Sequence, residues 1–188
     1  MAFLKFKLSS CKPPNLMIKE TFRLNECKNF NGQITNIIDN IFLSDINGAM
    51  DDQMLQEKKI THIIDCTSIP QNDSYLKKDI TYLKLNIEDT LEFSIRSSFI
   101  KAIKFIEEAT KMMGNILIHC QQGISRSPSI IISYLIYSKK LSFERSLEIL
   151  QRKIHSVEPN LGFIIQLQEW QAYLIEKNYN IKEMIDCQ

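Results

Sequence analysis

Histidine, glycine, proline and tryptophan are all scarce in this sequence of 188 residues, which has three histidines, five glycines, five prolines and one tryptophan. Three histidines without metal-ligand spacing give little support for a structural zinc site, because such sites use clustered histidine and cysteine. The net charge is only +1, whereas nucleic-acid-binding domains are usually strongly basic. The longest apolar runs are far shorter than the ~20 residues that cross a bilayer. We therefore expect no metal or other cofactor, no nucleic-acid partner and no membrane span.

Cysteine is limited to five residues, and none of them forms a C-x-x-C pair: Cys11, Cys27, Cys66, Cys120 and Cys187. An odd count in a chain of this size argues against a disulfide framework. Lys5 and Lys7 interrupt the apolar start of the chain before a signal-peptide core can form. We expect reduced thiols and a cytoplasmic protein, with the nucleus as a second compartment. The sequence indicates no oligomeric state.

Hydrophobic patterning divides the chain into three parts. Residues 1–32 show no clear periodicity and contain Pro13-Pro14, which predicts an irregular arm or one that packs against the domain. Residues 33–178 carry the patterned sequence, and their length fits one domain of typical size. Residues 179–188 form a short tail. The apolar fraction of the whole chain, 44%, is enough for one sizeable core.

Short β-branched segments alternate with amphipathic segments across the patterned region, and this alternation predicts an α/β layered domain. Gly114 marks the end of the longest amphipathic segment, and Ser94 or a neighbouring residue is a candidate N-cap for it. The predicted strands are residues 34–38, 41–43, 60–66, 80–85 and 115–119. The predicted helices are residues 48–58, 93–113, 128–139, 143–153 and 161–177.

The segment from Asn115 to Lys139 combines a buried strand, a short loop and a nearly all-apolar helix. Ser127 is a good N-cap, and Pro128 suits the first helical position because its missing N–H costs nothing there. The loop thus lies at a helix N-terminus, where unpaired N–H groups and the helix dipole favour an anion. Gly123 permits the positive φ that lets successive N–H groups point inward. The segment therefore predicts an anion-binding loop.

Two side chains complete this loop. Cys120 begins it, and the reactive thiolate form of a cysteine is favoured by a helix N-terminus and by nearby positive charge. Arg126 ends it, and its planar guanidinium matches two phosphate oxygens and stays charged at any relevant pH. A nucleophile, an anion cradle and a bidentate cation therefore occur within seven residues. This arrangement suits attack by sulfur on a phosphorus atom that the loop holds.

The loop resembles a known signature through the residues His119-Cys120-Gln121-Gln122-Gly123-Ile124-Ser125-Arg126-Ser127. The pattern His-Cys-x-x-Gly-x-Ser-Arg-Ser is similar to the signature of the protein tyrosine phosphatase superfamily, and the trailing Ser-Arg-Ser-Pro is most similar to its dual-specificity branch. The resemblance covers residues 33–174 and implies the cysteine-phosphatase fold, a central and mostly parallel mixed sheet of about five strands flanked by helices. It also implies that phosphate is bound by Gln121, Gln122, Gly123, Ile124, Ser125 and Arg126.

The resemblance further implies a general acid, because the leaving oxygen of a phosphate ester needs a proton. Asp89 is the best candidate, since it follows a strand, lies in a polar loop before a long helix and precedes Cys120 by 31 residues. Glu88 and Glu92 are the alternative acids. Asp89 could instead begin a turn or cap the helix over residues 93–113.

By the same resemblance, three further residues support the reaction. His119 holds the loop by hydrogen bonds and helps to keep Cys120 ionised, or it is simply a core histidine. Ser127 donates to the sulfur and eases breakdown of the phosphocysteine. Cys66 ends the 60–66 strand, which the fold places beside the strand that leads to Cys120. Cys66 is either a redox partner that forms a reversible disulfide with Cys120 or a small buried hydrophobic residue.

Three functions fit these residues. The first is a protein phosphatase that acts on phosphotyrosine and phosphoserine or phosphothreonine, since the chain is too short for the elements that deepen the pocket of tyrosine-only relatives. The second is a phosphoinositide or RNA 5′-phosphatase, which the neutral Gln121, Gln122 and Ile124 disfavour, because lipid-directed relatives place lysines in the loop. The third is a non-catalytic phosphoprotein-binding module, which the presence of Cys120 and Arg126 disfavours.

The N-terminal arm carries a basic-then-apolar pattern, in which Lys5, Lys7 and Lys12 are followed by Leu16-Met17-Ile18. This pattern loosely resembles segments that bind MAP kinases, and it is also common by chance. We expect phosphorylated proteins as partners, with MAP kinases among the candidates.

Overall fold

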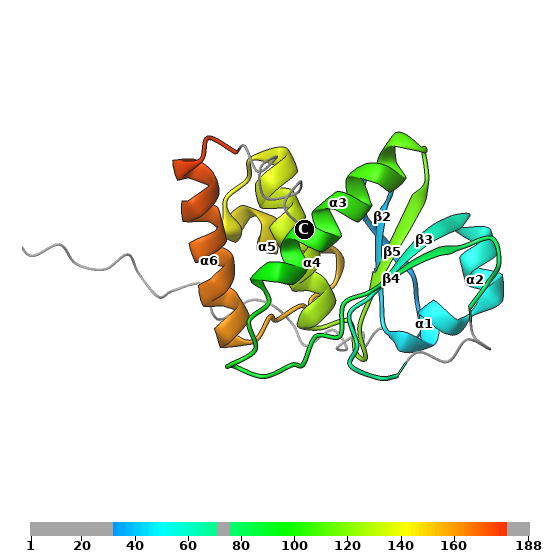
Figure 1. The fold of residues 1–188 in the computed structure, drawn as a ribbon. Coiled ribbons are helices and arrows are strands. Elements are labelled where there is room, and N and C mark those ends of the chain that lie inside the picture. Colours follow the sequence, from blue (N-terminus) through cyan, green and yellow to red (C-terminus); the bar gives the residue numbers. More distant parts are fainter. Residues whose placement is uncertain (1–31, 71–75, 180–188) are drawn as a thin grey trace, which may run out of the picture.

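A five-stranded sheet forms the centre of the molecule. The computed structural model describes residues 32–70 and 76–179, and its strands lie in the order β1-β2-β5-β3-β4 (Figure 1). β1 runs antiparallel to β2, and every other neighbouring pair is parallel. The expected mostly parallel mixed sheet is therefore confirmed. The strands are β1 (Thr35–Ile38), β2 (Ile41–Ser44), β3 (Ile60–Asp65), β4 (Thr81–Lys84) and β5 (Asn115–His119).

Helices cover both faces of this sheet (Figure 1). Two short helices pack on one face, and four longer helices lie on the other. Successive strand side chains point to opposite faces, so Ile63 joins a small apolar cluster under the short helices while Ile64 joins the main core. The helices are α1 (Ile46–Met50), α2 (Asp52–Glu57), α3 (Arg96–Lys111), α4 (Arg126–Lys139), α5 (Phe143–Lys153) and α6 (Leu161–Glu176).

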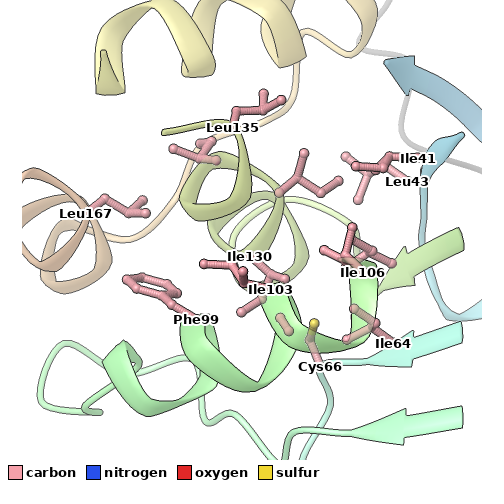
Figure 2. Packing of buried hydrophobic residues seen from close by; sticks show 14 of the residues in the cluster. Ile41, Leu43, Ile64, Cys66, Phe99, Ile103, Ile106, Ile130, Leu135 and Leu167 are labelled. Carbon is pink, nitrogen blue, oxygen red and sulfur yellow. The ribbon is translucent and has the colours of Figure 1, made fainter. Parts of the chain in front are cut away.

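The main core fills the space between the sheet and the four longer helices (Figure 2). Phe99, Ile103 and Ile106 of α3 are fully buried in it. α4 lies in the middle of this layer, and ten of its fourteen residues are buried. The prediction that this helix is buried on most sides is confirmed. Burying one large apolar side chain stabilises a fold by roughly 1.5–3 kcal/mol. Because α4 buries several such side chains, its position in the core is well fixed, and so is the position of its first residue.

The carboxyl ends of β3 and β5 lie side by side at one edge of the sheet. The two strands are parallel, and Asp65 at the end of β3 pairs with His119 at the end of β5. Cys66 and Cys120 follow directly, and the Cys66 N–H donates to the carbonyl oxygen of His119 at 2.9 Å. The expected placement of the 60–66 strand beside the strand that leads to Cys120 is confirmed. In open α/β sheets this edge is where ligands bind.

The segment over residues 48–58 was expected to be one helix and is two. Asp51 interrupts it, because its backbone is extended, with φ −85° and ψ 103°. Its side chain accepts a hydrogen bond from the Met54 N–H and so caps α2. A capping aspartate thus starts a second helix where hydrophobic spacing alone predicts continuity.

The long amphipathic helix also starts later than predicted, at Arg96. The N-cap position is Ile95, the neighbour of Ser94, and it makes no side-chain cap bond. The Ile95 N–H instead donates to the Gln166 side chain of α6 at 2.9 Å. A partner that is distant in the sequence therefore replaces the expected local cap.

The predicted arm (residues 1–32) and tail (residues 179–188) fall almost entirely outside the described residues, as does the basic-then-apolar pattern, and all of these stay predictions. Across residues 32–70 and 76–179, none of the helices combines the length and the apolar character that crossing a membrane requires.

Gly162, the second residue of α6, gives a test of how tightly this helix is docked. A Cβ atom at Gly162 would lie 2.2 Å from the carbonyl oxygen of Leu91, in the loop before α3. Alanine normally stabilises a helix by about 1 kcal/mol relative to glycine, but here it must push α6 away from backbone atoms. We expect Gly162→Ala to lower the free energy of unfolding by about 1–3 kcal/mol, measured by urea denaturation.

Ser97→Ala is the matched control for this substitution, because Ser97 is the exposed second residue of α3. We expect it to change the free energy of unfolding by less than about 0.5 kcal/mol. A neutral or stabilising effect of Gly162→Ala would contradict the close contact between α6 and the loop.

Candidate active site

The loop after β5 leads directly into α4. α4 begins at Arg126, and its N-cap residue is Ser125, which makes no side-chain cap bond. The prediction that Ser127 caps the helix with Pro128 in first position is therefore wrong, since both lie within the first turn. The physical reason is that Ser127 has another partner, because its Oγ donates to the Cys120 sulfur at 3.2 Å. The N-terminus of α4 still lies at the loop, as the anion-binding prediction requires.

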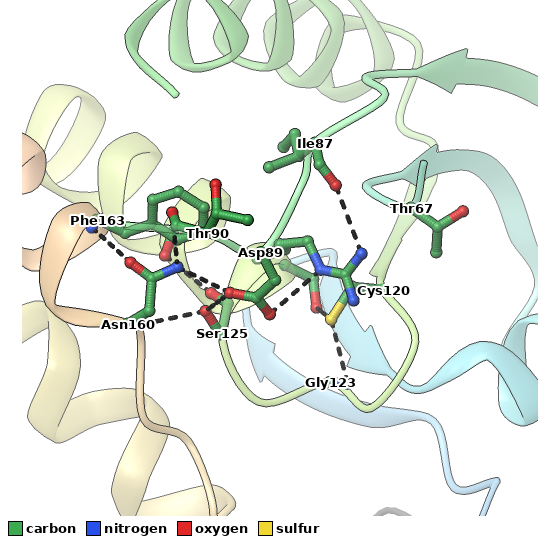
Figure 3. Close-up of polar contacts among 12 residues, drawn as sticks. Thr67, Ile87, Asp89, Thr90, Cys120, Gly123, Ser125, Asn160 and Phe163 are labelled. Carbon is green, nitrogen blue, oxygen red and sulfur yellow. Dashed lines mark hydrogen bonds and ion pairs between the residues drawn. The ribbon is translucent and has the colours of Figure 1, made fainter. Parts of the chain in front are cut away.

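Cys120 is buried, with 1% of the residue exposed, and its sulfur accepts two hydrogen bonds. One donor is the Ser127 hydroxyl, and the other is the Gly123 N–H, also at 3.2 Å (Figure 3). Gly123 has a φ of 73°, which glycine adopts without strain. This conformation turns its N–H toward the sulfur. Two donors directed at one sulfur suit an acceptor that carries negative charge.

Neighbouring segments hold the loop from two sides. The Ile46 N–H donates to the Gln121 carbonyl oxygen at 3.4 Å, and the Glu158 N–H donates to the Ile124 carbonyl oxygen at 2.9 Å. Gln121 and Gln122 are exposed, whereas Ile124 is half-buried. The loop is therefore fixed by backbone contacts, while its variable side chains are accessible to a substrate.

Asp89 lies against the loop although it comes from a different part of the chain (Figure 3). Its Oδ1 accepts a hydrogen bond from the Ser125 hydroxyl at 2.7 Å, and its Oδ2 lies 3.3 Å from the Arg126 Nε. The Arg126 Nη1 also donates to the Ile87 carbonyl oxygen at 3.4 Å. The structure thus brings the predicted acid, the predicted cation and the predicted nucleophile into one site.

The alternatives to this placement of Asp89 do not fit the geometry. Asp89 does not cap the following helix, because the N-cap of α3 is Ile95. Glu88 and Glu92 are exposed, and in the described part of the chain neither forms a hydrogen bond or ion pair with the loop. Of these three acidic residues, only Asp89 contacts the loop through its side chain in the described part of the chain.

Asn160 is a site residue that the sequence reasoning missed. Its Nδ2 donates to the Asp89 carboxylate at 2.8 Å, and its backbone N–H donates to the Ser125 hydroxyl at 3.1 Å (Figure 3). Its Oδ1 accepts the Phe163 N–H at 2.9 Å and so caps α6. Asparagine before an apolar helix predicts the cap. Nothing in the local sequence predicts the contact with a carboxylate 71 residues away.

His119 is buried beneath the loop. Burial lowers the pKa of its imidazole, while Asp65, whose Oδ1 lies 3.8 Å from the His119 Nε2, and the Cys120 backbone act in the opposite direction. The His119 Nδ1 has no hydrogen-bond partner among the described residues, so the expectation that His119 holds the loop by hydrogen bonds stays a prediction. Its role in ionising Cys120 also stays a prediction.

Cys66 is fully buried in the main core, next to the catalytic loop. Burial raises the pKa of its thiol well above the ordinary value, and the nearby Cys120 raises it further. A thiol attacks another sulfur as its thiolate, so this environment disfavours a rapid redox role and favours the reading as a small hydrophobic residue. A disulfide between Cys66 and Cys120 stays a prediction.

Comparison with known proteins agrees with this geometry. The family model of the dual specificity phosphatase catalytic domain matches residues 41–173. Dual specificity protein phosphatase 15 of Mus musculus is 36% identical over 137 residues, which cover 73% of this chain and 57% of the mouse protein. The chain thus spans just over half the length of that relative. MAP kinase phosphatase with leucine-rich repeats protein 3 of Dictyostelium discoideum is 33% identical over 143 residues, which cover 76% of this chain and 16% of that protein.

A solved structure shares the fold as well. The crystal structure of DUSP15 superimposes with a TM-score of 0.73 at 34% sequence identity, over 78% of this chain and 92% of that one. The loop, the sheet order and the family model all lead to the same assignment. The chain belongs to the dual specificity phosphatase family, and residues 41–173 contain the family's catalytic domain.

Proposed function

We propose that this chain is a protein phosphatase that hydrolyses phosphotyrosine and phosphoserine or phosphothreonine on proteins through a phosphocysteine intermediate. The observation that carries the proposal is the convergence of Cys120, Arg126 and Asp89 at the N-terminus of α4. A nucleophile, a bidentate cation and a carboxylic acid are the three groups that phosphate transfer to sulfur requires.

In the first step the Cys120 sulfur attacks phosphorus, a sulfur–phosphorus bond forms and the bond from phosphorus to the ester oxygen breaks. Asp89 gives its proton to the departing oxygen, so that a neutral alcohol leaves. Arg126 and the loop N–H groups stabilise the charge on the phosphoryl oxygens throughout. Such preorganised donors act strongly because they need no reorganisation during the reaction.

In the second step Asp89 takes a proton from water, and the water oxygen attacks phosphorus. The sulfur–phosphorus bond breaks and phosphate is released. The Ser127 hydroxyl, 3.2 Å from the sulfur, stabilises the departing thiolate. The acid of the first step is therefore the base of the second.

The ion pair between Asp89 and Arg126 suits an exchange of partners on substrate binding. A bound phosphate dianion takes the guanidinium of Arg126 for itself, because a bidentate contact to phosphate is strong. It also places negative charge beside Asp89, and a proton on the carboxyl group relieves the repulsion. Substrate binding thus prepares the acid that the first step uses.

The rim of the site favours phosphoproteins over highly anionic lipids or RNA ends. Glu88 and Glu92 next to Asp89 are exposed, as is Glu158, whose backbone contacts the loop. Carboxylates around a phosphate site repel additional phosphate groups of the same molecule. The similarity to a protein named as a MAP kinase phosphatase supports MAP kinases as candidate substrates, and a cytoplasmic location stays part of the proposal.

Asp89→Asn tests the acid role directly. We expect kcat/KM for an ester with a poor leaving group to fall by about 10²–10⁴-fold, because the leaving oxygen is no longer protonated, while substrate affinity changes little. The measurement is steady-state hydrolysis of a phosphotyrosine peptide across the pH range. The kcat/KM for an aryl phosphate with a very acidic phenol, which reports on the first step alone, should fall far less. An unaltered rate for the peptide at every pH would refute the role of Asp89.

Asn160 offers a pair of variants that separates positioning of Asp89 from helix capping. Asn160→Ser keeps an oxygen that can cap α6 and loses the amide donor to Asp89, whereas Asn160→Ala loses both. We expect both variants to lower kcat for the peptide by about 2–10-fold, and only Asn160→Ala to lower the free energy of unfolding by about 1 kcal/mol. Full turnover by Asn160→Ser would show that the amide contact with Asp89 is dispensable.

The substrate class is tested with a panel of phosphopeptides, phosphoinositides and RNA with 5′-phosphates. We expect the highest kcat/KM for phosphopeptides, because the loop is neutral and the rim is acidic. Cys120→Ser should abolish hydrolysis and retain phosphopeptide binding. Faster turnover of a phosphoinositide or an RNA end would overturn the proposed substrate, and phosphopeptide binding without hydrolysis by the unaltered chain would indicate a binding module.

A further inference from the structure

A partly buried ion pair lies below the catalytic loop, between β3, which pairs with β5, and β4, the strand beyond it. The Lys84 Nζ at the end of β4 lies 2.6 Å from the Asp65 Oδ2 at the end of β3, and the two side chains are only 13% and 22% exposed. The same Nζ donates to the Thr67 hydroxyl at 2.7 Å, and the Thr67 N–H donates to the Asp65 Oδ1 at 2.7 Å. Both carboxylate oxygens of Asp65 are therefore fixed.

This ion pair is connected to the nucleophile through one side chain. Asp65 is paired in register with His119 across the parallel strands, and its Oδ1 lies 3.8 Å from the His119 Nε2. His119 is bonded to Cys120 through the main chain. A continuous path thus runs from Lys84 through Asp65 and His119 to the reacting sulfur.

We propose that Lys84 and Asp65 are positioning residues of the catalytic loop, in which the lysine holds the carboxylate and so sets the charge of the imidazole that precedes Cys120. This role of Lys84 and Asp65 rests on the proposed phosphatase function. It adds to that function, because neither residue touches the substrate or belongs to the loop signature.

The charges around His119 explain how the pair acts. Burial opposes a charge on the ring, Asp65 and the buried Asp45 favour it, and Lys84 opposes it. Burial keeps the pKa of His119 lowered, and Lys84 offsets part of the attraction from Asp65. Without Lys84, the same carboxylate faces His119 with no compensating cation. The pKa of the ring should then rise, so that a positive charge next to Cys120 persists to higher pH than in the parent protein.

The test follows the His119 ring by NMR titration of the full chain, together with the pH dependence of kcat/KM for an aryl phosphate. In Lys84→Met we expect the midpoint of the His119 titration to move to higher pH, by about threefold to tenfold in proton affinity. In Asp65→Asn we expect it to move to lower pH, because the attracting carboxylate is gone. The pH profile of kcat/KM should change over the same pH interval in each variant.

Lys139→Met is the matched control, because Lys139, at the end of α4 away from His119, forms an ion pair with Asp39 in which both side chains are well exposed, 42% and 57%. It should leave both readouts as in the parent protein. If Lys84→Met does not fold, the proposal is tested with Asp65→Asn and with the double variant Lys84→Met/Asp65→Asn. Removing both charges should return the His119 titration midpoint from its value in Asp65→Asn toward the parent value.

The proposal would be overturned if Lys84→Met and Asp65→Asn both kept the His119 titration midpoint and the pH profile of the parent protein. If these variants only lowered the melting temperature, the ion pair would have a purely structural role. The NMR titration does not depend on turnover. Absence of phosphatase activity in the unaltered chain would therefore refute the proposed function while the titration still decides how Lys84 acts on His119.

Discussion

The parallel pairing of β5 with β3 is the contact on which the rest of the site depends. It brings the carboxyl ends of two strands to the same edge of the sheet, so that His119 lies opposite Asp65 and the catalytic loop starts next to Cys66. α4 fixes the other end of the loop, because it is buried on nearly all sides. The loop therefore needs little stabilisation of its own. Its geometry is imposed by a central strand and a central helix.

A second convergence places the acid. Asp89, Ser125 and Asn160 come from three segments and meet in one hydrogen-bonded group. Because Asn160 also caps α6, the docking of that helix and the position of the carboxylate are coupled. The close approach of Gly162 to the loop before α3 belongs to the same coupling. A change at the start of α6 is thus transmitted to the acid without altering any group that touches the substrate.

Two ion pairs flank Cys120, and they differ in whether a bound phosphate can take the place of the carboxylate. Arg126 and Asp89 lie on the open side, where a phosphate can take the place of the carboxylate. Lys84 and Asp65 lie below the loop, where Thr67 completes the contacts of both side chains. Removing one partner of a buried pair leaves an uncompensated charge, which is costly. The first pair is therefore suited to exchange during the reaction, and the second to holding a constant field around His119.

The sequence by itself determined the layered α/β fold, the order of strands and helices and the anion-binding loop, because hydrophobic periodicity and the spacing of Cys120, Gly123 and Arg126 are local properties. The resemblance to the phosphatase superfamily also named Asp89 as the acid and Ser127 as a donor to the sulfur, and the structure brings both side chains to the loop. Only the tertiary structure decided the partners of Asn160 and showed that Lys84 lies beneath the loop. A hydroxyl or an amide has several acceptors within reach in an isolated segment. Which one it takes depends on the distant segments that the fold brings to the same edge of the sheet.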